Sequence, residues 1–143
     1  MPNTNIEQLI SLIITTTRLI REHTKHREKI DPLSYLQLGT LRYVAEKNNP
    51  PMKDVADHLC ITPPSATSLI NNLTKMKQLE RIYDKDDRRL IRLAITAKGR
   101  KTLEDGFKKI TIRMQRVLSK LSEKERSDFI KILEKLSRAY SNK

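Results

Sequence analysis

Several residue types are scarce in this chain of 143 residues, and each absence excludes a class of protein. A single cysteine, Cys60, rules out an internal disulfide framework and is typical of a protein in a reducing cytoplasm. Tryptophan is absent, aromatic residues make up only 4%, and the chain has three glycines. A β-sandwich or barrel would need more turn glycines and more aromatic strand residues, so we expect a mainly α protein.

Absent motifs narrow the function further. No apolar run approaches the roughly 20 residues that span a bilayer, and the N-terminus has no signal-peptide pattern. We therefore expect a cytoplasmic protein without a membrane partner. The sequence also has no glycine-rich phosphate loop, nucleophile elbow or convincing acid–base pair. An enzyme is therefore the weakest interpretation, and no cofactor is expected.

The chain carries a large excess of positive charge. The 29 lysines and arginines outnumber the 17 aspartates and glutamates and give a formal net charge of +12. Such a balance indicates a polyanionic partner, with nucleic acid the first choice and an anionic membrane surface the second. The length is that of one domain with a real core.

A polar-faced helix is expected over residues 63–79. Thr62 can cap it, and Pro63 suits its first position, where a missing N–H costs nothing. A shorter helix over 52–59 and a tight turn precede it, which is the helix-turn-helix pattern. Its outer face carries small neutral donors and acceptors suited to base edges and phosphates. The candidate DNA-binding residues here are Thr62, Pro64, Ser65, Thr67, Ser68, Asn71, Asn72 and Lys75.

A small β-hairpin is expected next, with strands at 81–83 and 90–95 around a charged tip over 84–89. Ile82, Leu93 and Ile95 are its candidate inward residues. An aspartate one or two residues from an arginine can hold the guanidinium in one direction. The alternative is a surface turn whose charges neutralise each other, but the preceding polar helix favours a DNA-binding wing. Its candidate contacts are Asp87, Arg88 and Arg89.

Long helices are expected at both ends of the chain, over 5–29, 97–118 and 123–140, with one more over 34–47. Thr96 caps the helix from 97, and Ser122 with Glu125 forms a capping box for the last one. The first helix carries a wide apolar stripe that one partner helix would only partly cover. We interpret it as a dimerisation element.

Three segments resemble the MarR family of transcriptional regulators. They are Leu33-Ser34-x-x-Gln37-x-x-x-Leu41, then Asp54-Val55-Ala56-Asp57-His58-Leu59, and finally the wing. The wing match is the most specific: an acidic run from Asp84 leads into Arg88-Arg89-Leu90, followed by Leu93-x-Ile95-Thr96-x-x-Gly99.

The resemblance implies a winged helix-turn-helix fold in one domain over 1–143. Residues 33–96 would form the DNA-binding part, and 1–30 with 97–143 the dimerisation helices. A homodimer would bind a pseudo-palindromic site in double-stranded DNA, with the polar helix in the major groove and Arg89, supported by Asp87, in the minor groove. The resemblance also implies a repressor that responds to a small-molecule effector or to stress.

The sequence departs from the family pattern at three positions. Gln78 stands where members often have glycine after the recognition helix, so that helix must end without an easy left-handed residue. Cys60 stands where glycine is common in the turn. Met52 stands where a capping threonine or serine is usual.

Three alternatives stay open. Cationic residues near the C-terminus suggest a non-specific DNA-architectural or anionic-membrane-binding protein, although a solvated helix face explains them more simply. Cys60 suggests a redox switch, although a small buried hydrophobe is the favoured interpretation. His23 and His26 suggest a metal site, but no third ligand stands at convincing spacing, so no metal is expected.

Overall fold

The computed structural model describes residues 4–27 and 32–141. It contains six helices and one hairpin in these ranges, which confirms the predicted mainly α fold with a β-hairpin wing. The elements are α1 (Thr4–Arg27), α2 (Pro32–Lys47), α3 (Asp54–Leu59), α4 (Pro63–Lys75), β1 (Leu79–Tyr83), β2 (Ile91–Ile95), α5 (Ala97–Leu118) and α6 (Glu123–Ser141).

The hydrophobic core lies where α2, α3, α4 and the hairpin meet. Its fully buried side chains come from each of these elements and include Leu41, Val55, Ile70, Leu73 and Leu93. The helices contribute one apolar face each, so the polar face of α4 is left outside. This small core positions the helix-turn-helix and the hairpin relative to each other.

The two strands of the hairpin pair antiparallel, with Leu79 opposite Ile95 and Tyr83 opposite Ile91. A bridge between Pro51 and Arg92 extends the sheet by a short edge segment. The amide of Met52 donates to the carbonyl of Ile91 at 2.8 Å, so Met52 belongs to that segment and α3 begins only at Asp54. Ile82 was expected to point inward, but it is 39% exposed, because only alternate residues of this two-stranded sheet face the core.

Helix α4 ends at Lys75 and not at Leu79 as predicted. Lys77 adopts a left-handed conformation with φ of 58°, and the chain then turns into β1. Gln78, the residue found in place of the family's glycine, is buried; its amide donates to the Leu73 carbonyl at 2.9 Å. The start of α5 packs directly on this turn, because a Cβ added to Gly99 would lie 2.1 Å from the carbonyl oxygen of Gln78. Tertiary packing therefore determines where α4 ends.

The predicted helix caps are confirmed. The hydroxyl of Thr96 accepts from the amide of Gly99 at 3.0 Å at the start of α5. At the start of α6, the Ser122 amide donates to the Glu125 carboxylate at 2.7 Å and the Glu125 amide donates to the Ser122 hydroxyl at 3.2 Å. This reciprocal pair is the capping box.

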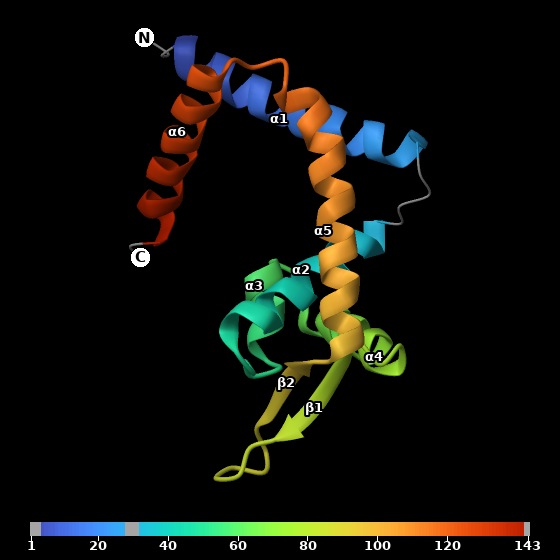
Figure 1. Ribbon diagram of the computed structural model, residues 1–143. Coiled ribbons are helices and arrows are strands. Elements are labelled where there is room, and N and C mark those ends of the chain that lie inside the picture. Colours follow the sequence, from blue (N-terminus) through green and yellow to red (C-terminus); the bar gives the residue numbers. More distant parts are fainter. Residues whose placement is uncertain (1–3, 28–31, 142–143) are drawn as a thin grey trace.

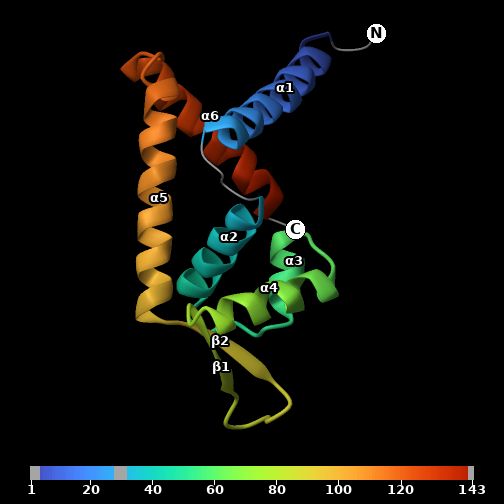
Figure 2. The same ribbon diagram turned by 90° about the vertical axis from the view of Figure 1, so that its right-hand side faces the viewer.

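The terminal helices extend away from the core. Helix α5 rises from it, α1 crosses the far end of α5, and α6 folds back as a separate arm (Figure 1). In the turned view, α1 points away from α5 while the wing projects at the opposite end (Figure 2). Large apolar side chains on α1 and α6 are exposed, among them Ile13 at 61% and Ile130 at 57%. Among the described residues, no helix is long and apolar enough to cross a membrane.

Candidate nucleic-acid interface

One side of α4 is buried and the other carries the polar residues that the sequence singled out. Ala66, Leu69, Ile70 and Leu73 are buried against the core. The exposed candidates are Thr62, Pro64, Ser65, Thr67, Ser68, Asn71 and Lys75, whereas Asn72 is half-buried. The predicted outer face is therefore presented to solvent, with Asn72 at its edge.

The start of α4 is fixed by Thr62, as expected. Its backbone is extended and its hydroxyl accepts from the amide of Ser65 at 3.4 Å. The same hydroxyl lies 2.9 Å from the Ser65 hydroxyl and donates to it. Ser65 is therefore held in the first turn, where the free N–H groups and the positive end of the helix dipole attract anions such as phosphate.

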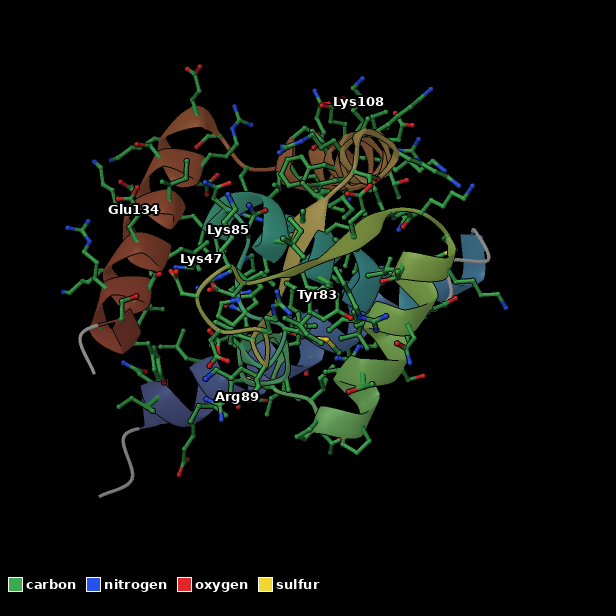
Figure 3. All side chains as sticks on the ribbon, turned by 90° about the horizontal axis from the view of Figure 1, so that it is seen from below. Lys47, Tyr83, Lys85, Arg89, Lys108 and Glu134 are labelled. Carbon is green, nitrogen blue, oxygen red and sulfur yellow. The ribbon has the colours of Figure 1, made fainter. Side chains whose placement is uncertain are left out.

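The wing carries the arrangement that the family resemblance implied. The carboxylate of Asp87 accepts from Nε of Arg89 at 3.1 Å and from the Arg89 amide at 3.0 Å. The Arg89 side chain is nevertheless 92% exposed, so it is oriented without being covered. Arg88 is also exposed. Seen from below, the hairpin with Lys85 and Arg89 faces the viewer and α4 lies to one side of it (Figure 3).

A second acidic residue organises the base of the wing, and sequence reasoning missed it. The carboxylate of Asp84 accepts from Nε of Arg92 at 2.8 Å and from the amides of Asp86 and Asp87. The hydrogen bond from Arg92, followed by those two amides, lowers the pKa of Asp84 from 3.8 to about 2. Arg92 also donates to the carbonyl of Asn49 at 3.2 Å, which ties the wing to the loop after α2.

A further contact joins α4 to the wing. Nη2 of Arg81, in β1, donates to Oδ1 of Asn71 on the exposed face of α4. The sequence offered no signal for this pair beyond the two residue types, because they lie ten positions apart in different elements.

A cavity of about 340 Å³ lies between α3, α4 and the hairpin, with Lys53 and Arg89 among its lining residues.

Cys60 occupies the turn of the helix-turn-helix. It is exposed and has φ of 53°, so the favoured interpretation of a small buried hydrophobe was wrong. The left-handed backbone explains why glycine suits this position, since glycine adopts it at no steric cost. The redox switch stays a prediction.

The metal hypothesis concerned His23 and His26, whose side chains lie outside the part of the chain that the structure describes. Within the described part, no group of three histidine, cysteine, aspartate or glutamate side chains is arranged to hold a metal ion.

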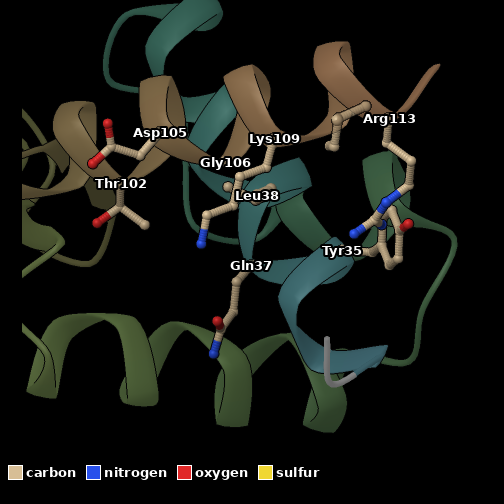
Figure 4. A pocket seen from close by; sticks show the side chains of 9 residues that line it. Tyr35, Gln37, Leu38, Thr102, Asp105, Gly106, Lys109 and Arg113 are labelled. Carbon is tan, nitrogen blue, oxygen red and sulfur yellow. The ribbon is translucent and has the colours of Figure 1, made fainter. Parts of the chain in front are cut away.

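Another cavity, of about 300 Å³, lies between α2 and α5, away from the DNA-facing side. It is lined by Tyr35, Gln37, Leu38, Thr102, Asp105, Gly106, Lys109, Ile110 and Arg113. Tyr35 and Arg113 lie together at one end (Figure 4). The sequence gave no direct signal for it, because its walls come from two helices that are about 65 residues apart along the chain.

No family model matches the chain. The HTH-type transcriptional regulator MhqR of Bacillus subtilis (strain 168) is 26% identical over 122 residues, covering 83% of this chain and 84% of MhqR. The crystal structure of the transcriptional regulator BldR from Sulfolobus solfataricus matches with 26% identity and a TM-score of 0.77, covering both chains fully. A MarR family protein from Bacillus stearothermophilus matches with 17% identity and a TM-score of 0.82 over 99% of both chains.

Two further structures share the fold and were determined as complexes. FabT of Streptococcus pneumoniae, in complex with DNA, has 21% identity and a TM-score of 0.69 over 97% of both chains. PcaV of Streptomyces coelicolor, in complex with its natural ligand, has 15% identity and a TM-score of 0.64, covering 92% of this chain and 91% of PcaV. The chain is thus similar along nearly its whole length to transcriptional regulators.

Proposed function

We propose that the chain is a MarR-family DNA-binding transcriptional regulator of the winged helix-turn-helix type, and that it acts as a homodimeric repressor of a pseudo-palindromic operator. One observation carries the proposal. Thr67 on the exposed face of α4 and the exposed Arg89, oriented by Asp87, line the same cavity between α4 and the wing, so the helix face and the wing cation lie next to each other. A helix and a wing in this arrangement suit adjacent grooves of one DNA duplex.

In the proposed complex, α4 enters the major groove and the wing reaches the minor groove. Thr62, Pro64, Ser65, Thr67, Ser68, Asn71, Asn72 and Lys75 form the α4 contacts, and Asp87, Arg88 and Arg89 the wing contacts. Hydroxyl and amide groups of α4 read base edges, while the cationic groups contact phosphates or the narrow minor groove. The net charge of +12 draws the protein to DNA and makes the affinity salt-dependent. A DNA target also agrees with the expected cytoplasmic location.

The homodimer is supported by the apolar faces of α1 and α6. Side chains such as Ile10, Ile13 and Leu133 are at least half exposed, which is costly for a monomer in water. A second copy placed against these helices would cover them and set two α4 helices apart by a fixed distance. In this proposal the helices α1, α5 and α6, within 1–30 and 97–143, form the dimerisation part, and 33–96 forms the reading part, which binds DNA.

We further propose that the cavity between α2 and α5 binds the effector. Its apolar side chains, Leu38 and Ile110, suit a small organic body. Two cations, Lys109 and Arg113, outnumber its one carboxylate, Asp105, and so favour an anionic group. The wall on α2 belongs to the reading part and the wall on α5 to the dimerisation helices. A ligand between them would therefore change the spacing of the two α4 helices.

Selection of bound duplexes from a random pool tests the DNA-binding proposal. We expect an inverted repeat whose half-sites are centred about one helical turn apart. Equal binding of all duplexes would overturn it and favour the non-specific architectural alternative. Binding to anionic vesicles that competes equally with duplex DNA would favour the membrane-surface alternative.

The effector proposal is tested with benzoate, an apolar ring with one carboxylate. Calorimetric titration should show binding that weakens in Arg113→Met and stays unchanged in Arg42→Met, a cation lost elsewhere on α2. Binding to operator DNA should fall as benzoate saturates the protein. Equal binding of benzoate to both variants would place the anion site elsewhere.

A further inference from the structure

The hydrogen bond between Arg81 and Asn71 determines what Asn71 can offer to DNA. Asn71 lies on the exposed face of α4, four residues before Lys75 and within the proposed major-groove surface. Arg81 is half-buried in β1, opposite the fully buried Leu93, and its Nη2 donates to the side-chain oxygen of Asn71. A residue of the wing strand β1 thus occupies part of the acceptor capacity of a residue on the exposed face of α4.

A free asparagine side chain reads adenine because it offers one donor and one acceptor. Adenine presents the matching pair in the major groove, an acceptor at N7 and a donor at N6. The guanidinium of Arg81 takes one of the two lone pairs of Oδ1 and places a positive charge beside the other. A base donor such as adenine N6 is therefore disfavoured at this oxygen, while the Nδ2 donors of Asn71 keep their capacity. The guanidinium adds further donors and no acceptor.

We propose that Arg81 is a specificity-determining residue, and that Asn71 and Arg81 act as one donor-rich, cationic unit that reads guanine in place of adenine. Guanine presents two acceptors in the major groove, N7 and O6, and so matches such a unit. This inference rests on the proposed function, since it assumes that α4 lies in the major groove. It assigns a role to a wing-strand residue that lies outside the recognition helix.

The hydrogen bond between Arg81 and Asn71 also restricts the orientation of the Asn71 side chain. Arg81 belongs to β1, which is paired residue by residue with β2, and Asn71 belongs to a helix whose other face is buried. The hydrogen bond therefore locks the Asn71 amide against a rigid sheet. A pre-oriented donor loses less conformational freedom on contacting a base than a free side chain does.

Duplex selection with variants tests the inference. The position in each half-site that loses its preference in Asn71→Ala identifies the base read by Asn71, and in the wild-type protein it should be guanine. In Arg81→Met, which keeps the side-chain stem, the preference at this position should shift toward adenine. We expect the guanine-to-adenine affinity ratio to fall by roughly 5- to 150-fold, the usual span for one base contact.

Two further variants serve as a charge control and as a substitute if Arg81→Met does not fold. Arg42→Met removes the same charge from an exposed site on α2 and should leave the selected motif unchanged. If Arg81→Met does not fold, Arg81→Lys keeps the charge on a single ammonium and should give a smaller shift in the same direction. An adenine at the Asn71-dependent position of the wild type, or an unchanged guanine in a folded Arg81 variant, overturns the inference. Absence of any selected motif overturns the proposed function instead.

Discussion

At the scale of single residues, two carboxylates in the wing perform separate tasks. Asp87 orients Arg89, which remains 92% exposed and free to contact DNA. Asp84 holds the base of the loop by accepting hydrogen bonds from Arg92 and from two backbone amides. One carboxylate therefore orients the proposed DNA contact, Arg89, and the other shapes the loop that carries it.

Replacing Arg89 by alanine is expected to weaken operator binding about tenfold or more, equal to about 1.4 kcal/mol, because a pre-oriented minor-groove cation is lost. The slope of log affinity against log salt should become shallower by about one for each lost cationic contact. Fluorescence anisotropy across a salt series measures both quantities. Arg42→Ala, which removes the same charge from α2, should change neither by a comparable amount; equal effects of the two variants would contradict the role of Arg89.

Acidification should loosen the wing within a defined pH window. The pKa of Asp84 is lowered in the folded protein from 3.8 to about 2, so its stabilising contribution is complete above about pH 4 and is lost as the pH falls toward 2. A titration of the Asp84 carboxyl followed by NMR should show its midpoint near 2. In Arg92→Met the midpoint should rise toward 3.8. A wild-type midpoint near 4 would show that the Arg92 contact is absent in solution.

At the scale of elements, the turn between α4 and β1 fixes the orientation of α4 relative to the wing. Lys77 takes the left-handed conformation, and Gln78 is buried behind it. The Gln78 amide group donates to the hydroxyl of Thr102 on α5 at 3.2 Å. The end of α4 is therefore anchored to α5, the long helix that leads to the proposed dimerisation region. Thr102 also lines the α2–α5 cavity.

Glycine substitutions at neighbouring positions should have opposite effects on stability. Lys77→Gly should stabilise the fold by about 1 kcal/mol, because glycine adopts a positive φ without steric cost. Gln78→Gly should destabilise it by about 1–3 kcal/mol, because a buried hydrogen bond and its packing are lost. Urea unfolding at one fixed protein concentration measures both. Lys75→Gly, within α4, is the helical control and should lower the free energy of unfolding by about 1 kcal/mol. A loss of stability in Lys77→Gly would contradict the left-handed conformation of this turn.

At the scale of the whole molecule, the chain has a small core at one end and uncovered apolar helices at the other. Helix α5 connects the two ends (Figure 1). The apolar residues of α1 lie on one stripe with Ile13 near its centre, whereas Ser11 lies nearly opposite. Burial of such stripes in a second copy is the physical basis of the proposed dimer.

Ile13→Asp should shift the protein toward monomer and weaken operator binding, because a charge would be buried in the dimer interface and the two half-sites would no longer be bound together. Sedimentation velocity at micromolar concentration and anisotropy with the full operator measure the two effects. Ser11→Asp adds the same charge on the opposite side of α1 and should leave both unchanged. A dimeric Ile13→Asp protein would exclude this stripe from the interface.

Features set by neighbouring residues could be predicted from the sequence. The caps at Thr62, Thr96 and Ser122 depend on contacts three residues apart, and the Asp87–Arg89 pair on contacts two residues apart. Local backbone geometry brings such groups together whatever the rest of the chain does. The order of helices and strands followed from hydrophobic periodicity, and the polar face of α4 from the same pattern.

The tertiary structure decided what depends on distant residues. It ended α4 four residues before the predicted end, exposed Cys60, paired Arg81 with Asn71 and joined Arg92 to Asn49 across 43 positions. It also formed the α2–α5 cavity. These contacts depend on how the elements pack, and a linear pattern holds no information on which side chains meet across a core. The sequence by itself thus determined that the chain has a polar-faced helix and a hairpin wing, whereas packing decided which atoms these two elements present on the surface proposed to bind DNA.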